Sequence, residues 1–229
     1  MESRCDNCIV RQFNSLRALS KEELKMVSDS KISKKIKKGE ALFVEGQKLD
    51  GVFCVRDGVS KLSKLSSNGK EQIVKLTNKG EIMGQRSVIA EDCTNLSATA
   101  INDMKVCFIP KEIITGTLNT NPYFSLEVLR HMAHDLKVAD DVIVNMSQKT
   151  VKQRLAEAFM YLRKNYGEDE NGFLLLTLSR EDYANIVGAA TESLIRMISE
   201  FKKKELIKTS GKKIGIIDEN ILQELADGF

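Results

Sequence analysis

The chain has 229 residues, a formal net charge of +3 at pH 7, 29% charged and 42% apolar residues, and five cysteines. These values are typical of a soluble globular protein of one large or two small domains. Because no apolar run approaches the ~20 residues of a membrane span, and the N-terminus lacks the apolar core of a signal peptide, we expect a cytoplasmic protein with reduced thiols and no membrane partner.

Two cysteines, Cys5 and Cys8, lie close together near the N-terminus. Thiolates at this spacing can share a metal ion or a cluster, or can act as a reversible redox sensor. The alternative is a pair of free surface thiols, with Cys54 and Cys107 as small core residues. The residues alone leave these interpretations open.

Residues 20–30 predict a short amphipathic helix whose capping box is formed by Ser20 and Glu23. From Lys34 to about Ile109 the sequence changes to short apolar runs separated by glycines. Many short strands with regular turn signals predict an all-β sandwich, jelly roll or barrel. The expected strands lie at 41–44, 52–55, 59–65, 72–76 and 105–109.

A long helix is predicted after Pro122, over about 123–146. Its apolar residues follow a 3, 4, 3, 4, 3 spacing, which is the a/d pattern of a coiled coil. A helix of this kind can instead pack on the sheet of its own domain, and amphipathic helices do so more often than they dimerise. The expected seam consists of Leu129, Met132, Leu136, Ala139, Ile143 and Met146.

Residues 179–206 carry the strongest functional signal. A short capped helix is followed by Gly188, which suits a tight turn because glycine adopts positive φ readily. A second helix is predicted over about 191–203, and Glu192 and Arg196 project from one side near its start. A helix-turn-helix presents side chains to the major groove in this way. The alternative is an ordinary helical hairpin with a solvated Glu192–Arg196 salt bridge.

The segment after this second helix favours DNA binding. Residues 206–209 and 213–217 alternate around a short turn, which indicates a β-hairpin and hence a winged helix. Between Arg196 and Lys213 there are seven basic and two acidic residues, a local excess that suits DNA phosphates. A paired DNA motif also favours a parallel homodimer for the long helix. We expect DNA contacts from Ser179, Arg180, Thr191, Glu192, Ser193, Arg196, Lys202, Lys203 and Lys212.

A β-rich domain, a long helix and a winged helix that opens on Ser179-Arg180-Glu181 match one architecture. The chain resembles the Crp/Fnr family of bacterial transcription regulators over about 10–225, with further similarity at 78–84 and 147–155. The resemblance implies an α+β fold made of an N-terminal β-roll (a cyclic-nucleotide-binding-like jelly roll), a long dimerisation helix and a C-terminal winged helix-turn-helix. The expected parts are 1–121, 122–146 and 147–229.

The resemblance also implies roles and partners. Arg196 would contact guanine and Glu192 a cytosine amino group, while Thr191 stands where nucleotide-binding members have another base-reading arginine. The expected partners are double-stranded DNA with a two-fold symmetric operator, a second copy of the chain and RNA polymerase. We expect a transcription regulator and not an enzyme. The alternative is a redox or iron–sulfur sensory protein in which DNA binding is secondary.

The effector region departs from the cyclic-AMP pattern. Leu96 stands where nucleotide-binding members have an arginine, so a phosphate would lose its bidentate partner. Arg86 is nearby but, as the adjacent residue of a strand, is expected to point to the opposite face, and Asp140 on the long helix would repel an anion. We therefore do not expect cyclic AMP to bind. The candidate effector residues are Gly84, Gln85, Arg86, Ser97 and Ala98.

Oxygen-sensing members of the family bind an iron–sulfur cluster through several N-terminal cysteines and one in the roll. Cys5, Cys8 and Cys107 match three of these positions, but no cysteine matches the fourth. Such a cluster needs four ligands, so three matched positions do not establish it as the cofactor. An iron–sulfur cluster is a candidate, a reversible thiol sensor is the alternative, and no cofactor is certain. Asp6, or a distant Cys54 or Cys93, would complete the set only by assumption.

Overall fold

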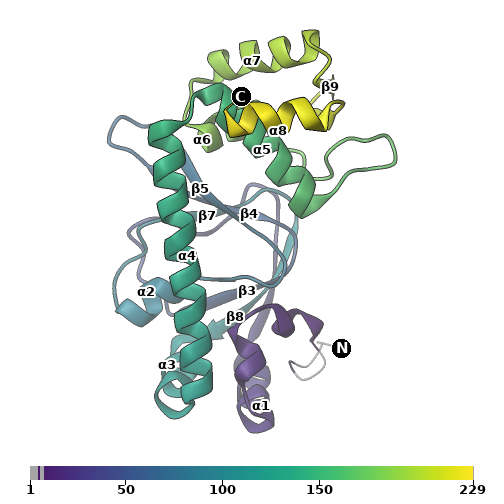
Figure 1. Cartoon of the computed structure of the whole chain (residues 1–229). Coiled ribbons are helices and arrows are strands. Elements are labelled where there is room, and N and C mark those ends of the chain that lie inside the picture. Colours follow the sequence, from purple (N-terminus) through teal and green to yellow (C-terminus); the bar gives the residue numbers. More distant parts are fainter. Residues whose placement is uncertain (1–4, 6–7, 229) are drawn as a thin grey trace. The chain divides into compact units, whose positions relative to one another are not determined.

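The computed structural model describes residue 5 and residues 8–228, and the chain divides into two compact units (Figure 1). Unit 1 contains the described residues up to Lys64 together with Val74–Ala139. Unit 2 contains Leu65–Ile73 and the described residues from Asp140 onward. The predicted boundaries at 121 and 146 differ from this division, because the long helix contributes residues to both units.

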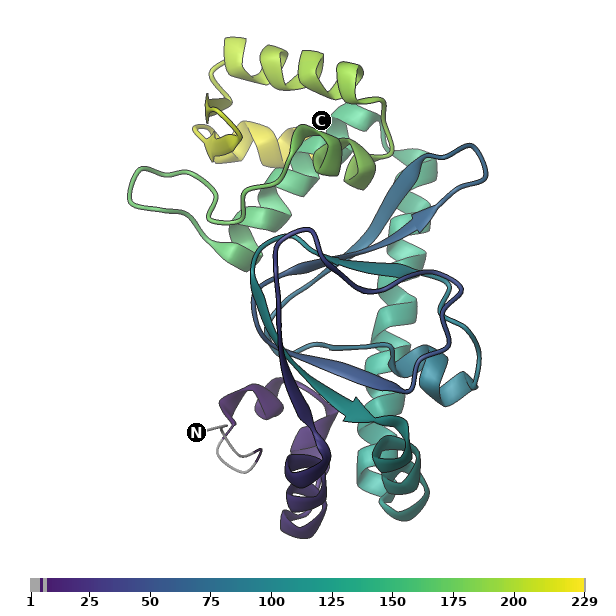
Figure 2. The same ribbon diagram turned by 180° about the vertical axis from the view of Figure 1, so that it is seen from behind.

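Two antiparallel four-stranded sheets form the roll, with the strand orders β1-β8-β3-β6 and β2-β7-β4-β5 (Figure 2). They confirm the predicted jelly roll, and each of the five predicted strands corresponds to an observed one. The polar strand β1, the short β7 and the two-residue β6 were not anticipated. The strands are β1 (Ile32–Ile36), β2 (Ala41–Phe43), β3 (Gly51–Asp57), β4 (Ser60–Leu65), β5 (Glu71–Thr77), β6 (Ile82–Met83), β7 (Ser97–Ala100) and β8 (Met104–Pro110).

Short helices surround the sheets of unit 1. The predicted capping box of the first α-helix is confirmed, since the Glu23 N–H donates to the Ser20 hydroxyl at 3.2 Å and the Ser20 N–H donates to the Glu23 carboxylate at 2.7 Å. The 3-10 helices η2 and η3 precede it, and two further α-helices were not predicted. These elements are η2 (Ile9–Phe13), η3 (Ser15–Ala18), α1 (Lys21–Ser30), α2 (Gln85–Ala90) and α3 (Lys111–Thr120).

The core of unit 1 lies on both faces of β3. Val52 and Val55 are completely buried, and Phe53 packs against Phe43 and Phe108, with ring centroids 5.8 and 5.2 Å away. The helices α1 and α3 contact the β3–β8 region, so this sheet is covered on the side away from its partner sheet as well. This double covering explains why 52–55 is a continuous apolar run and not an alternating one.

The long helix α4 (Pro122–Gln148) is followed by the winged helix of unit 2. Phe159 is fully buried at its centre, where its ring makes edge contacts with Tyr183 and Phe201 at centroid distances of 5.4 and 6.3 Å. None of the described helices has both the length and the apolar character needed to cross a membrane. The elements of this unit are α5 (Val151–Tyr166), α6 (Arg180–Val187), α7 (Thr191–Lys203), β9 (Ile207–Ser210), β10 (Lys213–Ile216) and α8 (Glu219–Asp227).

Candidate functional site

The first helix of the predicted helix-turn-helix begins and ends as the sequence indicates. Ser179 caps α6, because its hydroxyl accepts a hydrogen bond from the Asp182 N–H at 2.9 Å while the Asp182 carboxylate accepts from the Ser179 N–H at 3.2 Å. Gly188 ends the helix with φ of +65°, the left-handed conformation that glycine adopts without strain. Arg154 of α5 donates to the Val187 carbonyl at 2.8 Å and fixes this corner.

Helix α7 has one buried face and one exposed face. Leu194, Ile198 and Phe201 face the core, whereas Glu192 and Arg196 are exposed. Among the ion pairs of the described residues there is none between Glu192 and Arg196; the Arg196 guanidinium instead lies 3.4 Å from the Ser193 hydroxyl. The salt bridge of the helical-hairpin alternative is therefore not formed, and both charged groups face solvent.

The β9–β10 hairpin forms the wing, with Ser210 paired to Lys213 across a turn at Gly211 and Lys212. Arg180 at the start of α6 donates to the carbonyls of Gly211 and Lys212 at 3.1 and 3.3 Å. The sequence predicted Arg180 only as a DNA contact. In the structure Arg180 also holds the wing against the helix-turn-helix.

The basic residues of this region fall into two groups. Lys204, Lys208 and Lys213 each contact a carboxylate or carbonyl of the protein. Lys202, Lys203 and Lys212 are exposed, and none of their ammonium groups forms a hydrogen bond or an ion pair with another described residue. The second group is the one that was predicted to contact DNA, together with Arg196, Thr191 and Ser193 on α7.

The predicted seam on α4 is apolar and exposed. Leu129, Leu136 and Ile143, seven residues apart, are 62%, 64% and 66% exposed. A different stripe of α4 packs on the core of unit 1, and it contains the buried residues Phe124 and Val128. Leu129, Leu136 and Ile143 therefore have no apolar cover in the single chain. Of the other seam members, Ala139 is exposed, Met146 is half-buried, and Met132 is half-buried against the core of unit 1.

Two carboxylates fix α4 to the rest of unit 1, and sequence reasoning missed both. Glu127 forms ion pairs with Arg130 and Arg17 at 2.7 and 2.6 Å. Asp135 binds the Lys75 ammonium at 2.8 Å, and Lys75 also pairs with Glu81 at 3.0 Å. Burial alone would lower the pKa of Lys75, but the two carboxylates hold it above its ordinary value. Apart from Arg130, which is three residues from Glu127 on the same helix, these partners lie too far apart in sequence to form a recognisable motif.

The candidate effector residues lie around the start of α2 and on β7. Gly84 has φ of +84°, and a Cβ there would lie 2.8 Å from the Leu49 side chain, so the position requires glycine. Gln85 is half-buried and Ala98 is fully buried. The Ser97 hydroxyl accepts a hydrogen bond from the Glu45 N–H at 3.0 Å.

The assumption that Arg86 lies in a strand and points away is wrong. Arg86 belongs to α2, and its guanidinium donates to the side-chain oxygen of Asn95, one residue before Leu96. A positive-φ glycine starts a helix here, so the alternation of a strand does not apply. Arg86 therefore reaches the segment in which the sequence lacks the phosphate-binding arginine.

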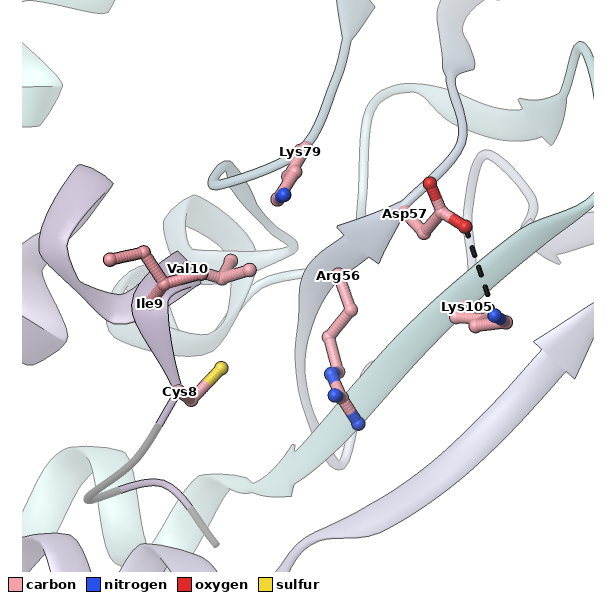
Figure 3. Close-up of a pocket in the computed structure, with 7 residues that line it drawn as sticks. All are labelled: Cys8, Ile9, Val10, Arg56, Asp57, Lys79 and Lys105. Carbon is pink, nitrogen blue, oxygen red and sulfur yellow. Dashed lines mark ion pairs between the residues drawn. The ribbon is translucent and has the colours of Figure 1, made fainter. Parts of the chain in front are cut away.

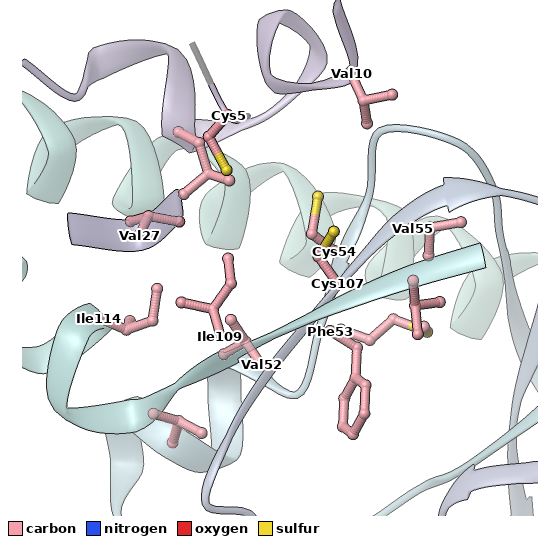
Figure 4. Close-up of a cluster of buried hydrophobic side chains, with 14 of the residues drawn as sticks. Cys5, Val10, Val27, Val52, Phe53, Cys54, Val55, Cys107, Ile109 and Ile114 are labelled. Atoms are coloured by element: carbon pink, nitrogen blue, oxygen red, sulfur yellow. The ribbon is translucent and has the colours of Figure 1, made fainter. Parts of the chain in front are cut away.

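Four cysteines belong to or pack against the core of unit 1, and Figure 4 shows three of them, Cys5, Cys54 and Cys107. Cys54 and Cys107 lie directly opposite each other on β3 and β8. Cys5 is buried in the same core, and Cys8 packs against it. We call Cys5, Cys8, Cys54 and Cys107 the cysteine cluster. The interpretation of Cys5 as a surface thiol is wrong, because Cys5 is buried and its N–H donates to the Ser28 hydroxyl at 3.0 Å; Cys93 is the exposed cysteine.

The thiol of Cys54 is strongly held in its neutral form. Burial, together with the neighbouring Cys107, Cys8 and Cys5, raises its pKa to about 12. The Asn14 amide lies 3.6 Å from its sulfur and also donates to the Gly80 carbonyl at 2.9 Å. Among the described residues, no three metal-ligating side chains are already arranged to hold a metal ion. Cys107, Cys8 and Cys5 all lie near enough to Cys54 to raise the pKa of its thiol, a proximity that the sequence could not show for Cys54.

These elements define a class of protein: a DNA-binding regulator in which a long helix connects a β-roll and a winged helix. The family description "Cyclic nucleotide-binding domain" matches residues 33–121, and "Crp-like helix-turn-helix domain" matches residues 153–225. The chain is 30% identical over 227 residues to Electron transport regulator A of Shewanella oneidensis, and the match covers 97% of this chain and 90% of that protein.

Other relatives agree. The chain is 29% identical over 228 residues to the fumarate and nitrate reduction regulatory protein of Vibrio cholerae, covering 97% of this chain and 90% of that protein. It shares its fold with a Crp/Fnr regulator from Eubacterium rectale at a TM-score of 0.80 and 22% identity, covering 93% and 97% of the two chains. The chain belongs to the Crp/Fnr family of transcription regulators. Its helix-turn-helix is a DNA-binding domain.

Proposed function

We propose that this regulator binds a two-fold symmetric DNA operator as a homodimer, without catalysing a reaction, and that α7 reads base pairs through Glu192 and Arg196. The observation that carries the proposal is the exposure of both side chains without pairing to each other. An arginine suits the O6 and N7 atoms of guanine, and a glutamate suits the amino group of cytosine. Each group is free to exchange water for a base edge.

The apolar stripe on α4 supports dimerisation. A soluble protein rarely leaves a row of large apolar side chains at heptad spacing uncovered. A second copy of the same helix would cover Leu129, Leu136 and Ile143 with its own stripe. Two recognition helices would then face a two-fold symmetric site. In the cytoplasm, RNA polymerase would be the protein partner that contacts the DNA-bound regulator.

We further propose that the signal enters through the cysteine cluster and not through cyclic AMP. An iron–sulfur cluster, when bound, would supply an oxygen- and redox-sensitive group. The four thiols match such a group in number and donor type. Cys54 and Cys107 provide sulfur from two paired strands, while Cys5 and Cys8 provide it from the segment above them. A change at these thiols would alter how the N-terminal segment is held on the roll.

The DNA-binding proposal is tested by selecting duplexes from a random pool with the wild-type protein. The enriched sequence should contain two symmetric half-sites separated by about one helical turn. Binding should weaken steeply as salt rises yet remain sequence-selective. Binding that loses all sequence preference would favour the alternative, a sensory protein in which DNA contact is secondary.

The sensing proposal is tested by measuring iron, sulfide and visible absorption of protein purified without oxygen. Cys54→Ala and Cys107→Ala should lower metal content or, for a thiol sensor, abolish the effect of oxidants on DNA binding, whereas Cys93→Ala should do neither. Calorimetry should show no tight binding of cyclic AMP, because Leu96 offers no charge-assisted contact to its phosphate. Equal behaviour of Cys54→Ala and Cys93→Ala would contradict the role of the cysteine cluster.

A further inference from the structure

A cavity of about 440 Å³ opens in unit 1 beside the start of η2 (Figure 3). It shares no residue with the candidate effector site around Gly84 and Ser97. Its volume lies within the range of small-molecule pockets, ~300–1,000 Å³. The residues that line it are Cys8, Ile9, Val10, Arg56, Asp57, Lys79 and Lys105.

An irregularity in β3 sets the position of Arg56, one of the cations that line the cavity. Val55 pairs with Val106 and Asp57 with Lys105, so Arg56 has no partner on β8 and forms a β-bulge. A bulge re-aims the side chain of the extra residue, and such bulges are frequent beside binding sites. Figure 3 shows the Arg56 guanidinium extending from β3 among the other side chains that line the cavity.

Lys79 is placed by a rigid turn. The Val55 N–H donates to the Glu81 carbonyl at 2.9 Å, and the Gly80 N–H donates to the Val55 carbonyl at 3.0 Å. The Asn14 amide donates to the Gly80 carbonyl at 2.9 Å and ties the N-terminal wall of the cavity to the same turn. These hydrogen bonds fix the backbone of the turn that carries Lys79 next to β3 and to the Asn14 side chain, which limits the backbone ordering that a ligand would have to impose.

The charges of the cavity are unbalanced. Within the described part of the chain, neither Arg56 nor Lys79 has a side-chain hydrogen bond or an ion pair. Lys105 and Asp57 are 3.9 Å apart and 63% and 67% exposed, so their mutual attraction is weak. Among the residues that the structure describes, the lining carries three cations and one carboxylate, a net charge of +2 that matches a doubly charged anion.

We propose that this cavity binds a terminal phosphate dianion, free or as the phosphate monoester of a small molecule. The Arg56 guanidinium can donate two parallel hydrogen bonds to phosphate oxygens, and Lys79 and Lys105 act as point charges around it. Ile9 and Val10 offer an apolar wall to the remainder of a monoester. Because Cys8 lines the same cavity, the ligand would lie against the N-terminal segment that carries two members of the cysteine cluster.

The test is calorimetric titration of the full-length, reduced protein with inorganic phosphate and with glycerol 3-phosphate, at constant ionic strength. Arg56→Gln should weaken binding about tenfold or more, because charge-assisted hydrogen bonds are lost, and Lys79→Gln should weaken it in the same direction. Lys48→Gln is the matched control, since Lys48 is an exposed lysine of unit 1 away from the cavity. Tighter binding of glycerol 3-phosphate identifies a monoester as the ligand, and equal binding identifies the free ion.

A second measurement locates the site independently of the variants. Bound phosphate should slow the alkylation of Cys8 by iodoacetamide and leave the rate at the exposed Cys93 unchanged, as read by peptide mass spectrometry. Unchanged thermal unfolding of Arg56→Gln would show that the variant is folded. The proposal is overturned if the wild-type protein binds neither probe, if Lys48→Gln weakens binding as much as Arg56→Gln, or if Cys8 is not protected.

Discussion

The exposed stripe on α4 gives a quantitative prediction for Leu136→Ala. Leu136 is 64% exposed in the single chain, and complete burial of a leucine side chain stabilises by about 1.5–3 kcal/mol. Covering the exposed two thirds would contribute about 1–2 kcal/mol in each chain, or about 2–4 kcal/mol in a symmetric dimer. Because each 1.4 kcal/mol is tenfold, Leu136→Ala should raise the dimer dissociation constant by about 30-fold to 700-fold.

Sedimentation equilibrium over a range of protein concentrations measures this constant directly. The matched control is Leu175→Ala, since Leu175 is 60% exposed but lies outside α4. The control should leave the dimer dissociation constant unchanged, and both variants should remain folded because neither side chain is in a core. If Leu136→Ala dimerised as tightly as the wild-type protein, the seam would not be the interface, and the exposed stripe would need another partner.

Three further outcomes are expected. Arg196→Ala should remove discrimination at one base pair of each half-site, by about 1–3 kcal/mol, in a binding assay on singly substituted operators; a uniform loss on all sequences would contradict base readout. Lys202→Gln should weaken DNA binding to all sequences alike and reduce the salt dependence of binding. Lys208→Gln should change the affinity and the salt dependence less, because the Lys208 ammonium donates to a carbonyl of the protein itself. The guanidinium groups beside Glu127, those of Arg130 and Arg17, hold the pKa of that carboxyl below its ordinary value of 4.5. The stability that they provide is therefore present above that value and lost as the pH falls below it. Chemical unfolding should show a steeper acid loss for the wild-type protein than for Glu127→Gln, and parallel pH profiles would contradict this.

Local chemistry in the sequence determined much of the C-terminal part. Ser179 with Asp182 fixes the start of α6, Gly188 fixes its end, and the apolar spacing of α7 separates a buried from an exposed face. Each of these signals acts within about one helical turn, so neighbouring residues suffice to specify it. For the same reason the capping box at Ser20 and the long helix after Pro122 were correctly predicted. The helix α2 was not, because its start depends on a glycine whose conformation the strand-like context concealed.

Tertiary structure alone decided which distant residues meet. Cys54 became a member of the cysteine cluster only because β3 pairs with β8 in a register that sets it opposite Cys107. Arg56 and Lys79 share a cavity because a β-bulge and a turn bring separate strands together. Strand register and loop closure depend on the burial of the whole core and not on adjacent residues, so spacing in the sequence carries no trace of them. The recognition helix could therefore be predicted from the sequence, whereas the cysteine cluster and the cavity became apparent only in the tertiary structure.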